Sequence, residues 1–258
     1  MKVWYMNGAG NDFMVIDARG KQLDFETLAV ELCKLTNADG FMAVDHSEIA
    51  DFKLHFYNSD GSRGEMCGNG SRCICRFAYD LGIAGERMTV ETDAGIVEGR
   101  RLSENQYVVK LNNPSVVDLN RKPDVAYVEL GDPGVPHAVK EIPGLSWEMG
   151  DALRDMARQL RCDKAFPKGA NVNLYTWLDE KTIRILTFER GVEDYTLACG
   201  TGSGSTAVTL WLKGLVPEGS LTVVNRGGTL KLTVEGSDGC VTALYLEGPT
   251  EVVKHFDI

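Results

Sequence analysis

The sequence predicts an α+β protein built from two similar halves, because part of the chain occurs twice. Residues 67–82 read CGNGSRCICRFAYDLG and residues 199–214 read CGTGSGSTAVTLWLKG, so a cysteine, three glycines and a serine fall at matching positions. Strand-like runs flank both stretches, LHF and RILTF before them and TVETDAGIV and TVVNRGGTL after them. A spacing of about 130 residues indicates a duplicated domain, since solenoid repeats are only about 20–50 residues long.

Hydrophobic periodicity and turn residues predict the elements of each half. A helix is expected from about residue 25 to 35, with Asp24 as its N-cap. Two more helices should follow the two CGxG stretches and end at Gly82 and Gly214, where glycine can adopt the left-handed conformation. The second of these is small or apolar on nearly every side and should be buried in its sheet. Strands are expected at 2–6, 12–17, 41–45, 52–57, 86–92, 95–101, 106–111, 221–224, 228–234 and 240–246.

The boundary between the halves is expected near Asn113–Pro114, because proline interrupts extended pairing. We therefore place an N-terminal half at residues 1–113, completed by residues 249–258, and a C-terminal half at residues 114–248.

Composition excludes several classes of protein. Lys+Arg 27 against Asp+Glu 37 gives a net charge of −10, the wrong sign for a protein that binds by neutralising phosphates, so no nucleic-acid partner is expected. No apolar run reaches the roughly 20 residues that cross a bilayer, and MKVWYMNGAGND lacks the apolar core of a signal peptide. We expect a cytoplasmic protein with no membrane partner, whose seven cysteines are reduced thiols.

Two cysteines, Cys67 and Cys199, each precede Gly-x-Gly and a predicted helix. A helix N-terminus offers unpaired backbone N–H groups and about half a positive charge, which suits a carboxylate. The same field can lower a thiol pKa from about 8.5 toward roughly 3.5–7.5. A thiolate beside an anion site, built twice, predicts one substrate held between two helix ends. One sulfur would remove an α-proton and the other would deliver a proton to the opposite face, inverting the stereocentre.

The other cysteines carry no such pattern. Cys73 and Cys75 could form a metal cluster with Cys67, but no CxxC pair and no nearby histidine completes a zinc site. We expect both to pack in the core, and no metal or other cofactor to be needed. The cysteines without any motif, expected to be structural, are Cys33, Cys162 and Cys240.

Eight short motifs follow one another along nearly the whole chain. They are GAGNDF at 8–13, NADGF at 37–41, FYNSDGS at 56–62, MCGNGSRC at 66–73, PHAV at 136–139, GANVN at 169–173, FERG at 188–191 and ACGTGS at 198–203. In these motifs the chain resembles the diaminopimelate epimerase family, two-cysteine isomerases of lysine and cell-wall biosynthesis. The resemblance implies two halves, each a curved, mostly antiparallel sheet around a central helix, related by a pseudo-twofold axis with the active site between them. It also implies a homodimer.

The resemblance also implies roles for the matching residues. Cys67 and Cys199 would be the acid–base pair, and His137 and Glu189 would tune the pKa values of the two thiols. The residues that hold the α-carboxylate of the amino-acid substrate would be Gly68, Asn69, Gly200 and Thr201. Further substrate contacts would come from Asn11, Asn58, Asn171, Glu189 and Arg190.

The residue types fit these roles but also allow simpler ones. Arg190 suits a bidentate grip on a carboxylate, and Glu189 suits an ammonium group. Without the resemblance, however, Asn11 and Asn58 could shape turns and Arg190 could form a surface ion pair. His137 could equally be a satisfied core residue.

One position departs from the family pattern. Many relatives read GNPH where this chain has Gly134-Val135-Pro136-His137, so an amide that touches the far end of the substrate is missing. Such a loss is worth roughly 1–3 kcal/mol, enough to favour another amino acid. We expect epimerisation of LL-diaminopimelate to the meso form. The alternatives are a racemase of another amino acid, such as histidine, and a non-catalytic amino-acid-binding or thiol redox protein.

Overall fold

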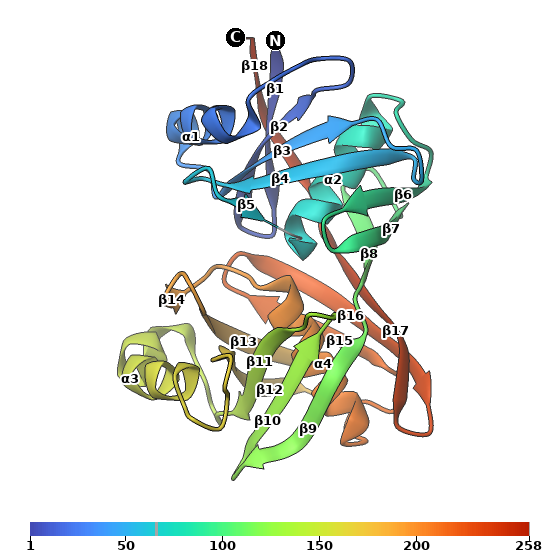
Figure 1. The fold of residues 1–258 in the computed structure, drawn as a ribbon. Coiled ribbons are helices and arrows are strands. Elements are labelled where there is room, and N and C mark those ends of the chain that lie inside the picture. The colour runs from blue at the N-terminus through green and yellow to red at the C-terminus, as the bar shows by residue number, and fades with distance from the viewer. Residues whose placement is uncertain (65–66, 258) are drawn as a thin grey trace. The chain divides into compact units, whose positions relative to one another are not determined.

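The computed structural model describes residues 1–64 and 67–257, which divide into two compact units (Figure 1). Unit 1 consists of Met1–Lys110 and Glu247–Ile258, and unit 2 of Leu111–Leu246. In each unit, strands pack around one buried helix. The predicted α+β fold with two similar halves is confirmed.

Unit 1 is a mostly antiparallel sheet that packs on the helix α2. Its strands are β1 (Lys2–Gly8), β2 (Asn11–Asp17), β3 (Gly40–Asp45), β4 (Phe52–Asn58), β5 (Arg63–Gly64), β6 (Arg87–Thr92), β7 (Gly95–Arg101), β8 (Gln106–Leu111) and β18 (Glu251–Asp257). Its helices are α1 (Phe25–Thr36) and α2 (Gly68–Asp80). The β2–β3 and β4–β6 pairs are parallel, and the other pairs of this unit are antiparallel.

Unit 2 repeats this plan around the helix α4. Its strands are β9 (Pro114–Lys122), β10 (Val125–Leu130), β11 (Val135–Glu141), β12 (Asn171–Asp179), β13 (Thr182–Glu189), β14 (Asp194–Tyr195), β15 (Ser220–Asn225), β16 (Gly228–Ser237) and β17 (Cys240–Pro249). Its helices are η1 (Trp147–Met149), α3 (Gly150–Arg161) and α4 (Gly200–Leu212). The parallel pairs β11–β12 and β13–β15 correspond to β2–β3 and β4–β6 of unit 1.

The two units differ in where one strand comes from. In unit 2, β9 pairs with β10 and directly precedes it in the chain. In unit 1 the corresponding strand is β18, which returns from the far end of the chain to pair with β1, so the two termini lie side by side (Figure 1). The strands are interrupted near Asn113–Pro114, as expected, because β8 ends at Leu111 and β9 begins at Pro114. Pro114 pairs with Leu130 at the first position of β9, where a strand tolerates the missing N–H.

The predicted helix ends are confirmed. Asp24 caps α1 by accepting hydrogen bonds from the backbone nitrogen and the hydroxyl of Thr27, at 3.2 and 2.7 Å. Gly82 and Gly214 follow the last residues of α2 and α4 with φ values of 66° and 72°. In both positions glycine allows the left-handed turn that ends a helix. The sequence did not predict α3 or strands β9 to β12.

The two central helices are buried in their units. Cys73 and Cys75 of α2 are fully buried, as predicted, and Cys33 of α1 lies in the core of unit 1. Cys162 and Cys240 are exposed, so neither packs in a core. No helix among the described residues is long and apolar enough to cross a membrane.

Candidate active site

Cys67 and Cys199 occupy the same structural position in the two units. Each is the N-cap of a central helix, with an extended backbone at φ −127° and ψ 117° for Cys67 and φ −121° and ψ 112° for Cys199. The Cys67 sulfur accepts a hydrogen bond from the Gly70 nitrogen at 3.5 Å, and the Cys199 sulfur accepts one from the Gly202 nitrogen at 3.3 Å. Each sulfur therefore takes the place of the usual N-cap oxygen, beside the backbone amides of a first helical turn.

The glycines that follow these cysteines let the first helical turn approach the sheet. A Cβ at Gly202 would overlap the side-chain oxygen of Asn173 on β12. A Cβ at Gly70 would come within 3.2 Å of the Met42 sulfur on β3. The spacing Cys-Gly-x-Gly thus places the sulfur and the first-turn amides where the sheet supports them.

In unit 1 the structure brings Asn11 and Asn69 together. Asn69 donates from Nδ2 to Asn11 Oδ1 at 2.6 Å, and Asn11 donates to Asp39 Oδ2 at 3.2 Å. Asn58, at the end of β4, instead donates to Ser62 Oγ at 2.9 Å and closes the turn after that strand. These contacts shape the turn after β4 and hold the Asn58 side chain at the end of that strand.

Arg72 is a residue of this region to which the sequence analysis gave no role. It is fully buried and donates from one terminal nitrogen to Asn69 Oδ1 at 3.0 Å and to the Gly68 carbonyl at 3.3 Å. An arginine among the helical residues after Cys67 carries no local sign of burial, although it stands inside the quoted MCGNGSRC motif. The motif therefore singled out Arg72, whereas the helical periodicity gave no indication that its side chain is buried.

In unit 2 the side chains around Cys199 favour its protonated form. Burial raises the pKa of the Cys199 thiol well above its usual value, and the Glu189 carboxylate raises it further. The Thr201 hydroxyl, 3.5 Å from the sulfur, and the Gly202 amide act in the opposite direction. The expected lowering of the thiol pKa by the helix N-terminus is wrong for Cys199, because burial and a neighbouring carboxylate outweigh it. Glu189 is itself held by Thr196 Oγ1 at 2.7 Å.

His137 lies fully buried on β11 as a neutral ring. Burial lowers the pKa of His137 to about 3, and the charge of Arg190 contributes in the same direction. Asn173 Nδ2 lies 3.2 Å from His137 Nδ1 and donates to the Ala138 carbonyl at 3.1 Å. With that amide nitrogen facing the ring, Nδ1 accepts and the ring proton is on Nε2. The sequence analysis missed Asn173, although it is two residues from Asn171 on the same face of β12.

Asn171 and Arg190 are also brought together. Asn171 Oδ1 accepts a hydrogen bond from the Arg190 backbone nitrogen at 2.8 Å, and Asn171 Nδ2 donates to the Pro136 carbonyl at 3.2 Å. The Arg190 guanidinium donates to the Lys168 carbonyl at 2.7 Å. Arg190 is thus anchored by the backbone, next to the segment that begins at Val135.

Val135 begins β11 beside a buried charged group. It pairs with Leu130 of β10, next to Glu129. The Glu129 carboxylate accepts from Lys168 Nζ at 2.7 Å and from the Tyr127 hydroxyl at 2.6 Å. Where many relatives have an asparagine, this chain therefore has a valine, in a strand that pairs with the strand carrying the ion pair of Glu129 and Lys168.

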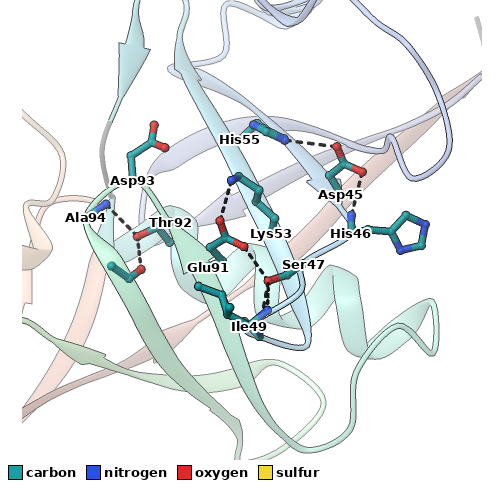
Figure 2. A network of polar contacts seen from close by, with 12 residues as sticks. Asp45, His46, Ser47, Ile49, Lys53, His55, Glu91, Thr92, Asp93 and Ala94 are labelled. Carbon is teal, nitrogen blue, oxygen red and sulfur yellow. Dashed lines mark hydrogen bonds and ion pairs between the residues drawn. The ribbon is translucent and has the colours of Figure 1, made fainter.

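Figure 2 shows a second polar network in unit 1, built on β3, β4 and β6. Glu91 accepts from Lys53 Nζ and from Ser47 Oγ, both at 2.6 Å, and Ser47 Oγ in turn accepts from two backbone amides of the β3–β4 connection. His55 Nε2 lies 3.4 Å from Asp45 Oδ2. These contacts tie the β3–β4 connection to β6, and none of the predicted site residues takes part in them.

Within residues 1–64 and 67–257, no three His, Cys, Asp or Glu side chains gather closely enough to hold a metal ion. The predicted site residues form other contacts: the two cysteines cap helices, the asparagines form amide hydrogen bonds, and His137 is a buried imidazole.

Known proteins resemble this chain over its whole length. The profile of the family described as diaminopimelate epimerase matches residues 3–117 and 131–253. The diaminopimelate epimerase of Aquifex aeolicus is 37% identical over 276 residues, covering 100% of this chain and 96% of that protein. That of Caldanaerobacter subterraneus subsp. tengcongensis is 34% identical over 282 residues, covering 100% and 99%.

Solved structures share the fold at much lower identity. A PhzF-family phenazine biosynthesis protein of Bacillus anthracis superposes with a TM-score of 0.75 at 16% identity, covering 100% of this chain and 98% of that one. A hydroxyproline epimerase of Agrobacterium vitis superposes with a TM-score of 0.69 at 14% identity, covering 100% and 90%. These two likenesses concern the fold alone. With the family profile matched in both halves and relatives above 30% identity over nearly their full length, the chain belongs to the diaminopimelate epimerase family.

Proposed function

We propose that this protein inverts one α-carbon of LL-diaminopimelate to give the meso isomer. Its membership in the family supports the substrate, since the relatives at 31–37% identity are named diaminopimelate epimerases. The observation that carries the chemistry is the matched pair of N-cap cysteines, Cys67 and Cys199, each beside the backbone amides of a first helical turn. The comparisons do not favour the alternative of a racemase for another amino acid.

In the proposed reaction Cys67 and Cys199 act on opposite faces of the same α-carbon. The thiolate takes the α-proton and becomes a thiol, and the opposite thiol gives its proton to the carbanion and becomes a thiolate. The enzyme thus ends each turnover with the two protonation states exchanged, and no net proton is lost or gained. These two transfers account for the whole inversion, so the reaction needs no cofactor.

The α-carboxylate would be held by the amides at the two helix N-termini. These amides belong to Gly68 and Asn69 in unit 1 and to Gly200 and Thr201 in unit 2. As the α-proton leaves, negative charge spreads into the carboxylate, so preorganised donors stabilise the transition state more than the ground state. The side chains proposed to contact the rest of the substrate are Asn11, Asn58, Asn171, Glu189 and Arg190.

His137 and Glu189 would act on the two thiols in different ways. His137 is neutral and buried, so it can donate a hydrogen bond but does not supply a positive charge. Glu189 acts on Cys199 through its negative charge and a side-chain hydrogen bond, and both raise the pKa of that thiol and favour its protonated form.

The test is proton exchange in heavy water with LL-diaminopimelate as substrate. We expect deuterium at one α-carbon of the product, and no turnover in Cys67→Ala or in Cys199→Ala. Cys162→Ala is the matched control, because Cys162 is exposed, and it should retain full activity. Full activity in either of the first two variants would refute the proposal, and so would loss of activity with a chelator that zinc restores.

We also propose that the protein acts in the cytoplasm as a homodimer. Light scattering on the purified protein would then report about twice the 28.3 kDa chain mass. A single-chain mass under assay conditions with full activity would contradict the dimer.

A further inference from the structure

Arg72 on α2 carries a buried charge, and no acidic side chain within residues 1–64 and 67–257 forms an ion pair with it. Its side chain is 0% exposed. One terminal nitrogen donates to Asn69 Oδ1 and the Gly68 carbonyl, while Nε and the other terminal nitrogen are buried with no hydrogen-bond partner among the described residues. Burying a guanidinium without a counter-ion is strongly unfavourable. Such an arrangement indicates that an anion belongs beside it.

The guanidinium lies next to the first turn of α2. Side chains of a helix lean toward its N-terminus, which is why Arg72 reaches Asn69 and Gly68, three and four residues before it. The N-terminus already carries about half a positive charge. The buried arginine therefore adds a full charge to a place that is positive before any ligand binds.

Among the described residues, the ionisable groups whose charge acts on Arg72 are three thiols, those of Cys73 and Cys75 in α2 and that of its N-cap, Cys67. Burial raises the pKa of Cys73 and of Cys75 to about 12, so both stay protonated. Cys67 is only partly buried. It is the thiol of the three that is placed to carry a negative charge beside Arg72.

The acidic groups on the strands that pack against α2 are held by other partners. Asp12 of β2, whose charge also acts on Cys73, accepts hydrogen bonds from the Tyr5 hydroxyl and from Asn7. Asp39, just before β3, accepts from Asn11 and from the Asp12 nitrogen. Arg76, one turn further along α2, is paired with Asp80.

Unit 2 has no equivalent of this arginine. The repeat places Gly204 where unit 1 has Arg72, and α4 contains neither lysine nor arginine. A side chain at Gly204 would press on Leu111 and Leu244, at 3.0 and 3.1 Å. Cys199 instead has Glu189 as its charged neighbour. The two cysteines thus share a backbone geometry but lie in opposite electrostatic surroundings.

We propose that Arg72 is a positioning residue that holds Cys67 as a thiolate and fixes the Asn69 amide beside it. The free enzyme then carries its negative charge on Cys67 and its transferable proton on Cys199. This rests on the proposed function only in assigning the two sulfurs to one reaction. This resting form can remove the α-proton of the isomer whose α-hydrogen faces Cys67. The other isomer reacts with the form in which Cys199 is the thiolate and Cys67 is the thiol.

The test measures alkylation by iodoacetamide as a function of pH, with each cysteine followed separately by peptide mass spectrometry. In the intact wild-type protein, Cys67 should reach half-maximal rate at a lower pH than Cys199. In Arg72→Met we expect the Cys67 midpoint to rise by about one to three pH units, the usual effect of removing a close opposite charge, and the Cys199 midpoint to stay in place.

Arg76→Met is the matched control on the same helix. Arg76 donates to Asn105 at 2.7 Å and to the Thr250 carbonyl at 2.8 Å, so its loss should lower stability and leave the Cys67 midpoint unchanged. Arg72→Lys keeps the charge and should keep the midpoint near that of the wild type.

An unchanged Cys67 midpoint in folded Arg72→Met overturns the proposal, as does an equal shift in Arg72→Lys. If Arg72→Met does not fold, the alkylation midpoints of the two cysteines in the wild type test the proposal. A lower midpoint at Cys199 than at Cys67 then overturns the proposal. Failure of the proposed function would look different, since α-proton exchange would then be absent in a wild type with a normal alkylation profile.

Discussion

At the scale of single residues, Cys199 shows how surroundings override local rules. Its place at a helix N-terminus favours the thiolate, yet burial and the carboxylate of Glu189 raise the pKa of the thiol. The carboxylate acts through its charge and through a side-chain hydrogen bond to the thiol, and Glu189 lies on β13, outside the helix that Cys199 caps.

We predict that Glu189→Gln lowers the pKa of Cys199, because a neutral amide no longer opposes the thiolate. The pH midpoint of Cys199 alkylation should fall by about one unit, with Cys67 in the same sample as an internal control. Thr196→Val, which removes only the hydrogen bond to Glu189, should shift the midpoint less. A midpoint that stays or rises in Glu189→Gln would contradict this.

His137 makes stability depend on pH. Its pKa is about 3 in the folded protein and about 6.5 in an unfolded chain, so below pH 6.5 the unfolded state binds a proton that the folded state does not. The contribution is therefore fully present above pH 6.5 and is lost as the pH falls from there toward 3.

We predict that between pH 6.5 and 5 the wild type loses stability relative to His137→Gln by about 1 kcal/mol per pH unit. Urea unfolding of both proteins at several pH values measures this difference. The substitution also lowers the free energy of unfolding at every pH through lost packing, so the slopes of the free energy against pH are compared rather than its absolute values. Parallel slopes would mean that His137 does not remain neutral in the fold.

At the scale of elements, the two halves end their central helices in the same way. Gly82 and Gly214 both have positive φ, and a Cβ at either position would meet no atom within 4 Å. The only cost of adding one is therefore backbone strain.

We predict that Gly82→Ala and Gly214→Ala each lower the free energy of unfolding by about 1–2 kcal/mol, the penalty of a left-handed residue with a Cβ. Gly85→Ala is the control, because its φ is not positive and its nearest neighbour would lie 4.0 Å away, and it should change little. Thermal unfolding of the three variants checks this, and equal melting temperatures would show that the helix ends relax without cost.

At the scale of the whole molecule, unit 1 depends on both ends of the chain. β1 is paired with β2 on one side and with β18 on the other. Removal of β18 would leave the backbone groups of β1 unpaired, which is unfavourable and promotes aggregation.

We predict that truncation after Thr250 destabilises unit 1 selectively. Hydrogen exchange should become faster in β1 and β2, while peptides from β10 to β13 of unit 2 keep their protection, because β9 covers β10 from within its own unit. Thr250 is retained so that its carbonyl still accepts from Arg76. Unchanged protection of β1 would mean that β18 adds little to this sheet.

The sequence by itself determined the duplication, the central helices with their caps, and the two N-cap cysteines. These features depend on contacts between residues a few positions apart, and rules for caps, turns and periodicity describe such contacts well. The eight ordered motifs added the family, which composition and spacing alone did not reach.

Only the tertiary structure decided the electrostatics of the site and which part of the chain supplies the strand that pairs with β1. The burial of Arg72, the neutral state of His137 against Asn173, and the raised pKa of Cys199 all depend on side chains brought together from different elements. The return of β18 to β1 is likewise a long-range pairing. Desolvation and charge interactions act through space, so residues with equivalent local sequences, such as Cys67 and Cys199, can differ in chemistry.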